Sequence, residues 1–192
     1  MALLSRFKEL NRTYTYAEFE QLPEFDEPVE LIEGKLVEKL TDDKHLLIVS
    51  NLSFYISSFD QQRRLGRAWV DSAFKLSAYN VALPELAYIT TERLPKGVSK
   101  SALTVIPDLV LEILAPVETS TREGTIVACA RIRRYQVAGV RLIWLVDPVS
   151  KAIEVFQPNS LEPIASLTEK DMLEGHEVIP GFTLKVKKLF EE

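Results

Sequence analysis

The chain has 192 residues, of which 46% are hydrophobic and 27% are charged, and its formal net charge at pH 7 is −5. This length suffices for one domain with a substantial core and is marginal for two, so we expect a single domain over residues 1–192. The single cysteine, Cys129, excludes an intramolecular disulfide framework and a Cys-rich zinc cluster. The negative charge argues against strong sequence-independent binding to nucleic acid, which needs clustered Lys and Arg.

Hydropathy also bears on where the protein acts. No apolar stretch approaches the roughly 20 residues that a helix needs to cross a bilayer. No charged and apolar leader precedes a small-residue cleavage site. We therefore expect a cytoplasmic protein that does not insert into a membrane.

The N-terminal part predicts a short helix followed by a β-hairpin. Thr15 can cap a helix through residues 16–22, and Glu18 three residues later completes a capping-box pattern. Residues 29–40, VELIEGKLVEKL, then alternate apolar and polar side chains around Glu33-Gly34, which is typical of a β-hairpin or a bent strand.

A first long helix and three strands come next. Residues 45–62 carry apolar side chains near helical spacing, and Asp42 and Asp43 are cap candidates before them. Three short segments rich in β-formers follow, with a Pro- and Gly-containing loop, residues 92–101, before the last of them. These segments are RAWVDSAFKLSA (67–78), LPELAYIT (83–90) and IPDLVLEILAP (106–116).

The C-terminal half predicts a second helix and further strands. The helix covers residues 121–138 and ends at Gly139, a C-cap residue. VRLIWLVDP (140–148) is apolar at nearly every position, which suits a central strand covered on both faces, and AIEVFQ (152–157) follows. The tail from 173 to 190 predicts short strands around a Pro180-Gly181 turn. The order indicates an α/β architecture with a mixed sheet and helices on its faces.

Two acids in the segment IPDLVLEILAP need an explanation, because an unpaired buried carboxylate is costly. Asp108, Val110 and Glu112 share one face of the expected strand. Four residues nonetheless separate the Cα atoms of the two acids by about 13 Å, so they cannot jointly hold one ion. A partner for Glu112 must come from a neighbouring strand, and the nearest candidate is Glu85. Asp108 is better explained by bonds to backbone N–H groups at the strand entrance.

Three acids and a histidine on separate elements could converge around this pair. Glu30 opens a strand of the hairpin, and His45 begins the first long helix. Carboxylates that fix Mg²⁺, with a cation from the Arg131–Arg134 cluster, form the constellation that metal-assisted phosphodiester hydrolysis needs. The simpler interpretations stay open here: Glu30 could sit at a strand edge, His45 could be satisfied by solvent, and Tyr135 could be a core aromatic residue.

Six segments in the same order resemble a known bacterial family. They are VELIEGKLVE, His45 on the next helix, LPELAYIT, IPDLVLEILAP, RRYQVAGVRLIWLVDP and VIPGFTLKVKKLF. From about Tyr14 to Phe190 the chain resembles the Uma-type family of putative restriction endonucleases, which is part of the PD-(D/E)XK nuclease superfamily.

This resemblance implies a fold, a reaction and a set of site residues. The fold would be a restriction-endonuclease-like αβββαβ core, over about residues 14–157, with the short strands of 173–190 after it. The reaction would be Mg²⁺- or Mn²⁺-dependent endonucleolytic cleavage of DNA, which is compatible with a homodimer because cutting a duplex needs two active sites. The implied metal ligands are Glu85 and Glu112, assisted by Glu30 and His45, with Arg131 as the phosphate-facing cation.

The sequence departs from the family pattern at two positions. Glu85 stands where the family usually has Asp, and a hard cation accepts either carboxylate. The superfamily lysine is Leu114 here, and the position on the following helix to which it moves in this family is Arg131. Arginine keeps the charge but is poorly suited to handling a proton. The alternative is therefore a catalytically degenerate nuclease fold that acts as a nucleic-acid-binding or regulatory module. A nuclease for RNA or a branched substrate is a third option.

Overall fold

The computed structural model describes residues 12–39, 43–94 and 102–192. The helices in these ranges are α2 (Tyr16–Phe19), α3 (Asp43–Asp60), α4 (Pro116–Ser120) and α5 (Arg122–Ala138), with 3-10 turns η1 (Thr91–Arg93) and η2 (Val186–Leu189). The strands are β1 (Val29–Ile32), β2 (Lys35–Glu38), β3 (Gly66–Val70), β4 (Phe74–Ser77), β5 (Asn80–Ala82), β6 (Leu86–Thr90), β7 (Leu109–Ile113), β8 (Leu142–Asp147), β9 (Ala152–Phe156), β10 (Ala165–Leu167), β11 (Met172–Glu174) and β12 (Thr183–Lys185). Within the same ranges, no helix combines the length and the hydropathy needed to span a bilayer.

The central element is a six-stranded mixed sheet with the order β10-β9-β8-β7-β6-β3. Strands β7 and β8 are parallel, and the other neighbouring pairs are antiparallel. The parallel pair is joined through α4 and α5, as a crossover connection requires. In chain order α3, β3, β6, β7, α5 and β8 give the predicted αβββαβ core, so the predicted fold class is confirmed.

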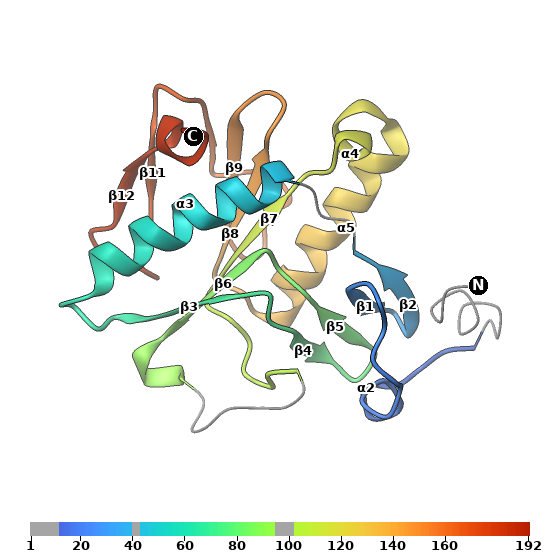
Figure 1. The fold of residues 1–192 in the computed structure, drawn as a ribbon. Coiled ribbons are helices and arrows are strands. Elements are labelled where there is room, and N and C mark those ends of the chain that lie inside the picture. The colour runs from blue at the N-terminus through green and yellow to red at the C-terminus, as the bar shows by residue number, and fades with distance from the viewer. Residues whose placement is uncertain (1–11, 40–42, 95–101) are drawn as a thin grey trace.

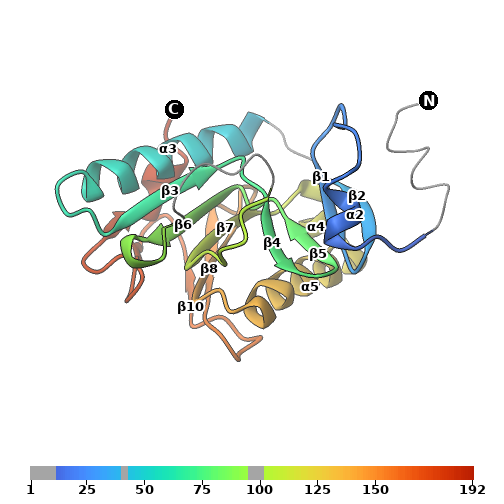
Figure 2. The same ribbon diagram turned by 90° about the horizontal axis from the view of Figure 1, so that it is seen from below.

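Helices cover the two faces of this sheet (Figures 1 and 2). Leu109 and Leu111 of β7 pack in one core cluster with Ile48 and Leu52 of α3. Val110 points the other way, into a cluster that contains Ile132 and Tyr135 of α5. Strand alternation therefore sends Glu112 toward α5, together with Val110, as the spacing of the segment predicts.

A second sheet, with the order β2-β1-β5-β4, lies on the same side of the molecule as α2 (Figure 1). Its β1–β2 hairpin is the one predicted from residues 29–40, with Glu33 and Gly34 at the turn. Gly34 has φ +78°, and a Cβ added there would clash with Thr13, so only glycine suits this turn. The hairpin brings Glu30 and the residue after β2, Lys39, to one end of the main sheet.

The strand count before α4 differs from the prediction. Residues 67–78 were expected to form one strand, but they form β3 and β4, which belong to different sheets. The break occurs at Asp71, whose φ of +48° turns the chain. The three-residue strands β5 and β10 were not predicted, because three residues are too few to establish an alternation.

The predicted capping box at Thr15, the helix end at Gly139 and the turn at Gly181 are confirmed, whereas α2 ends at Phe19 instead of residue 22 and α3 begins at the cap candidate Asp43 instead of residue 45. Thr15 and Glu18 form the capping box of α2, and Thr121 caps α5 by accepting a bond from Gly124 N at 2.9 Å. Gly139 ends α5 with φ +97°, and Gly181, with φ +80°, lies in the turn before β12. The cap candidate Asp42 and positions 95–101 of the predicted loop lie outside the described residues.

Candidate active site

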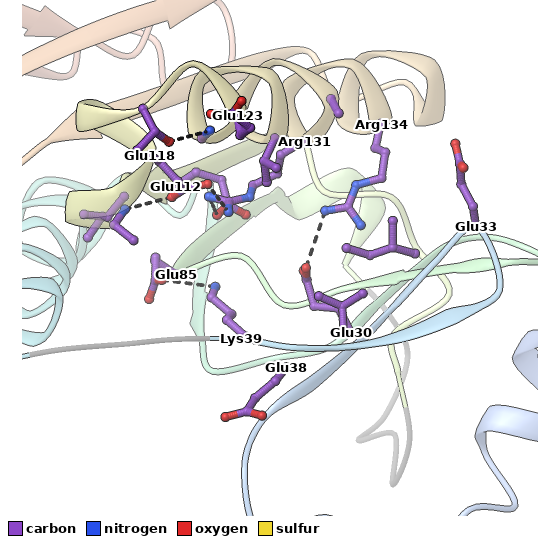
Figure 3. Close-up of a pocket in the computed structure, with 18 residues that line it drawn as sticks. Glu30, Glu33, Glu38, Lys39, Glu85, Glu112, Glu118, Glu123, Arg131 and Arg134 are labelled. Carbon is purple, nitrogen blue, oxygen red and sulfur yellow. Dashed lines mark hydrogen bonds and ion pairs between the residues drawn. The ribbon is translucent and has the colours of Figure 1, made fainter. Parts of the chain in front are cut away.

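A cavity of about 640 Å³ lies between α5, the β1–β2 hairpin, the start of β6 and the end of β7 (Figure 3). Its lining is rich in charge, with seven glutamates against three basic residues. The charged lining residues are Glu30, Glu33, Glu38, Glu85, Glu112, Glu118, Glu123, Lys39, Arg131 and Arg134.

The structure brings the five predicted site residues to this one place. Glu30 on β1, Glu85 before β6, Glu112 on β7 and Arg131 on α5 all line the cavity. His45 does not line it but lies behind Glu85, with its Nδ1 3.4 Å from Glu85 Oε1. His45 is 2% exposed, so the interpretation that solvent satisfies it is wrong.

Glu85 and Glu112 come from two neighbouring antiparallel strands. The pairing of β6 with β7 ends with Leu86 opposite Leu111, and Glu85, the residue before β6, donates its backbone N–H to Leu111 O at 3.1 Å. Glu85 therefore lies beside the end of β7 that carries Glu112, and both side chains line the cavity.

Asp108 lies at the other end of β7 and takes no part in the cavity. Its Oδ2 accepts bonds from Thr90 N and Thr90 Oγ1, both at 2.9 Å. Its Oδ1 is 2.5 Å from Arg93 Nη1 and 3.3 Å from Arg141 Nη1. The structural explanation for Asp108, bonding to backbone N–H at the strand entrance, is confirmed.

Two basic groups hold Glu85. Lys39 Nζ lies 3.1 Å from Glu85 Oε1, the same oxygen that His45 Nδ1 approaches. Burial raises the pKa of Glu85, but the bond from His45 and the charge of Lys39 outweigh it and hold the pKa below its ordinary value. Glu85 is therefore ionised at neutral pH, and one of its two oxygens is fixed.

Glu112 is held from α5. Tyr135 donates its hydroxyl to Glu112 Oε1 at 2.5 Å, and Arg131 Nη1 lies 3.4 Å from Oε2. Burial raises the pKa of Glu112 above its ordinary value, although the charges of Lys39 and Arg131 oppose this. Tyr135 is fully buried, as expected of a core aromatic residue, but its hydroxyl also orients a site carboxylate.

Arg131 is fixed by a second acid that the sequence analysis did not single out. Its Nη2 donates to Glu118 Oε1 at 2.6 Å, while Glu118 Oε2 accepts a bond from Ala115 N at 2.8 Å and so caps α4. Burial lowers the pKa of Arg131, but the charges of Glu112 and Glu118 more than offset this and raise it. The acid three residues after Ala115, with proline at the first helical position, is the signal that could have indicated Glu118 as a helix cap.

Glu30 lies on an inner strand, because β1 pairs with both β2 and β5. The strand-edge interpretation is therefore wrong. Glu30 Oε1 accepts a bond from Leu83 N at 2.9 Å, and Oε2 lies 3.4 Å from Arg134 Nη2. Glu30 thus connects the hairpin, the segment before β6 and α5.

The donor set at Glu85 and Glu112 fits a hard divalent cation. Within the described residues Glu85 Oε2 makes no hydrogen bond or ion pair, and Glu112 Oε2 has the single long contact to Arg131. Mg²⁺ is commonly bound through one or two carboxylates, with water and substrate phosphate completing the shell. Across residues 12–39, 43–94 and 102–192 no group of three or more His, Cys, Asp or Glu side chains is arranged to hold a metal ion.

Comparison with solved structures places this fold beside one described as a putative nuclease. That crystal structure, of a protein "belonging to DUF820" from Anabaena variabilis, has a TM-score of 0.75 and 23% sequence identity to this chain. The match covers 92% of this chain and 97% of the other. At this identity the likeness concerns the fold. A search among curated proteins gave no match.

A family profile matches the sequence itself. The profile of the Uma2 family, described as "Putative restriction endonuclease", matches residues 16–187. That interval contains every charged residue of the cavity lining. Because the match spans most of the 192 residues, this chain belongs to the Uma2 putative restriction endonuclease family.

Proposed function

We propose that this chain is a metal-dependent endonuclease that hydrolyses phosphodiester bonds in DNA. The observation that carries the proposal is the pair of buried carboxylates, Glu85 and Glu112, that line one cavity beside Arg131. Family membership supports the reaction class. The two carboxylates would hold Mg²⁺ or Mn²⁺, which supplies Lewis-acid stabilisation of the phosphate and a more acidic bound water.

The other residues of the site act by binding and orientation. Arg131 binds the phosphate and stabilises the negative charge that grows as the P–O bond breaks. Its guanidinium stays protonated, so it does not accept a proton from water. His45 holds Glu85, Tyr135 holds Glu112, and Glu30 keeps Arg134 at the cavity wall.

Cleavage of a supercoiled plasmid in Mg²⁺ or Mn²⁺ tests the proposal. We expect wild type to nick or linearise the plasmid and Glu112→Ala to lose this activity, because the variant lacks one of two metal ligands. Glu174→Ala, which removes an exposed glutamate on β11, is the matched control and should cut like wild type. Equal cleavage by wild type and Glu112→Ala would attribute the activity to a contaminant.

A calorimetric titration with Mg²⁺ or Mn²⁺ tests the metal site without substrate. Wild type should bind the ion, and Glu85→Ala should bind it more weakly, since a single carboxylate remains. No binding by wild type at millimolar concentration would contradict the site.

A second candidate function is a degenerate nuclease fold that binds nucleic acid or regulates a partner. It is favoured by Leu114, which packs against the α5 core cluster at the position of the superfamily lysine, and by the arginine at position 131. Arg131→Lys separates the two candidates. If it creates cleavage where wild type has none, the degenerate function is correct for the natural chain.

Further expectations from the sequence stand as proposals of the same kind. We propose that residues 1–192 form one nuclease-like domain, that it acts in the cytoplasm, and that it dimerises to cut both strands. Sedimentation with and without DNA would test the dimer. A panel of duplex DNA, RNA and branched DNA would test the substrate.

A further inference from the structure

Lys39 is a cation of the cavity that the sequence pattern did not indicate. It follows β2 directly, and its backbone N–H donates to Pro28 O at 2.8 Å, which extends the hairpin by one more bond. Its side chain is 13% exposed and lines the cavity. The backbone of Lys39 is thus fixed, and its side chain is directed inward.

The ammonium group of Lys39 is placed by two acceptors. It lies 3.1 Å from Glu85 Oε1 and also donates to Leu83 O. The Leu83 peptide is itself held, because Leu83 N donates to Glu30 Oε1 at 2.9 Å. An ammonium has three N–H donors, so these contacts leave one for a further acceptor in the cavity.

Basic groups reach the cavity from two opposite walls (Figure 3). Arg131 and Arg134 come from α5, and Lys39 comes from the hairpin side. The charge of Lys39 acts on both proposed metal ligands. It helps to lower the pKa of Glu85, and it opposes the rise that burial causes in the pKa of Glu112 more strongly than the charge of Arg131 does. A phosphate between the walls would meet a cation on each side.

We propose that Lys39 contacts a substrate phosphate from the wall opposite Arg131, as a second phosphate-binding cation of this site. The proposal rests on the proposed nuclease function and extends it. A divalent ion at Glu85 and Glu112 would compensate the carboxylates, so that the charge of Lys39 becomes available to a phosphodiester oxygen. A flexible ammonium suits this role because it acts as a point charge without a fixed fork.

The test is the salt dependence of binding to a short fluorescent DNA duplex in Ca²⁺, a hard cation that takes oxygen ligands. Lys39→Gln should reduce the slope of log K against log salt by about 0.9, the value expected for one lost phosphate contact. Lys39→Arg should keep the slope. Lys35→Gln is the matched control, since it removes the same charge from an exposed position on β2, the strand that Lys39 follows, outside the cavity lining, and it should keep the slope as well.

Several results would overturn the proposal. These are an unchanged slope in Lys39→Gln, an equal loss in Lys35→Gln, or no DNA binding by wild type. Because loss of the Lys39–Glu85 pair could unfold the variant, acetylation of wild-type lysines with and without DNA is a second measurement. DNA should protect Lys39 and leave Lys35 reactive, and equal reactivity of Lys39 in both states would contradict a phosphate contact. If Lys39→Gln changes the salt slope and DNA protects Lys39 from acetylation, but wild type does not cleave plasmid, the nuclease function alone is refuted.

Discussion

Glu112 is a residue of the candidate active site whose burial lowers the stability of the folded protein. Glu112 is 1% exposed on a central strand, and burial raises its pKa above the ordinary 4.5. A buried carboxylate whose partners do not fully compensate its desolvation destabilises the folded state when ionised. A group kept at such a cost is typical of a binding or catalytic site.

Replacing Glu112 by Gln should therefore stabilise the metal-free protein. Because the folded pKa is the higher one, the folded state holds more protons than the unfolded state above pH 4.5, and stability falls as pH rises through this window. In EDTA at neutral pH we expect Glu112→Gln to raise the free energy of unfolding, measured with urea, above that of wild type. Glu85→Gln is the matched control with the opposite sign, since the pKa of Glu85 is lowered in the folded protein. A loss of stability in Glu112→Gln would contradict this explanation.

Glu118 has two structural roles, because its Oε2 caps α4 and its Oε1 holds Arg131. The cap needs an acceptor, which Gln also provides, whereas holding the guanidinium depends on charge.

Glu118→Gln should thus keep the α4 cap and lower the rate of plasmid cleavage, with a moderate loss in the free energy of unfolding because the charge-assisted bond to Arg131 becomes a neutral one. If a poorly positioned Arg131 stabilises the transition state less by about 1.4 kcal/mol, the rate of cleavage falls roughly tenfold. Glu123→Gln, at an exposed glutamate on the first turn of α5 that also lines the cavity, is the control and should cut at nearly the wild-type rate. Equal rates in the two variants would exclude a positioning role for Glu118.

At the scale of elements, Asp108 joins three parts of the main sheet. Its carboxylate bonds Thr90 at the end of β6, Arg93 in η1 and Arg141 before β8, and the side chain itself is fully buried. The opposite end of the same strand carries Glu112. One strand therefore has an acid for assembly at its entrance and an acid for the site at its exit.

Asp108→Asn should lower the free energy of unfolding at neutral pH by about 2 kcal/mol, because charge-assisted hydrogen bonds are lost while the shape is kept. Burial raises the pKa of Asp108, but the bonds from Thr90 and Arg93 outweigh it and lower the pKa below the ordinary 3.8. The stabilisation is thus complete above that pH and disappears as pH falls through the lower, folded value.

Denaturant unfolding as a function of pH measures this effect. Glu177→Gln removes the 69% exposed acid that pairs with Arg141 and should cost far less. A similar loss in the free energy of unfolding in Asp108→Asn and Glu177→Gln would show that the buried bonds of Asp108 stabilise the fold no more than an exposed ion pair does.

At the scale of the whole molecule, charge sets the condition for binding DNA. The chain carries −5 at pH 7, and the cavity lining has seven glutamates against three basic groups. Without a cation this cavity repels phosphate.

DNA binding should consequently require a divalent cation. We expect affinity for a short duplex, followed by fluorescence anisotropy at constant ionic strength, to fall at least about tenfold when Ca²⁺ is replaced by EDTA. The double variant Glu85→Gln/Glu112→Gln removes two negative charges and should bind DNA in EDTA more tightly than wild type. Equal binding of wild type with and without Ca²⁺ would contradict the proposed metal site.

The sequence by itself determined the order of the longer elements and some of the residues that bound them. Periodicity, the Thr15 cap and Gly139 depend on neighbours a few residues away, and local patterns record such neighbours directly. The same reasoning separated Asp108 from Glu112, because spacing along one strand is fixed by its rise. It did not resolve β3 from β4, since a single turning residue between two apolar runs leaves the alternation of each intact.

The tertiary structure alone decided which charged groups meet. The distance of Lys39 from Glu85 and the bond between Arg131 and Glu118 depend on how the hairpin, α4 and α5 pack around the sheet. No periodicity marks these residues, because each contributes one polar side chain to a contact between distant elements. The pairing of β6 with β7 brought Glu85 and Glu112 to one cavity, and the sequence order could propose that proximity but not fix it, since a register shift by one residue sends a side chain to the other face.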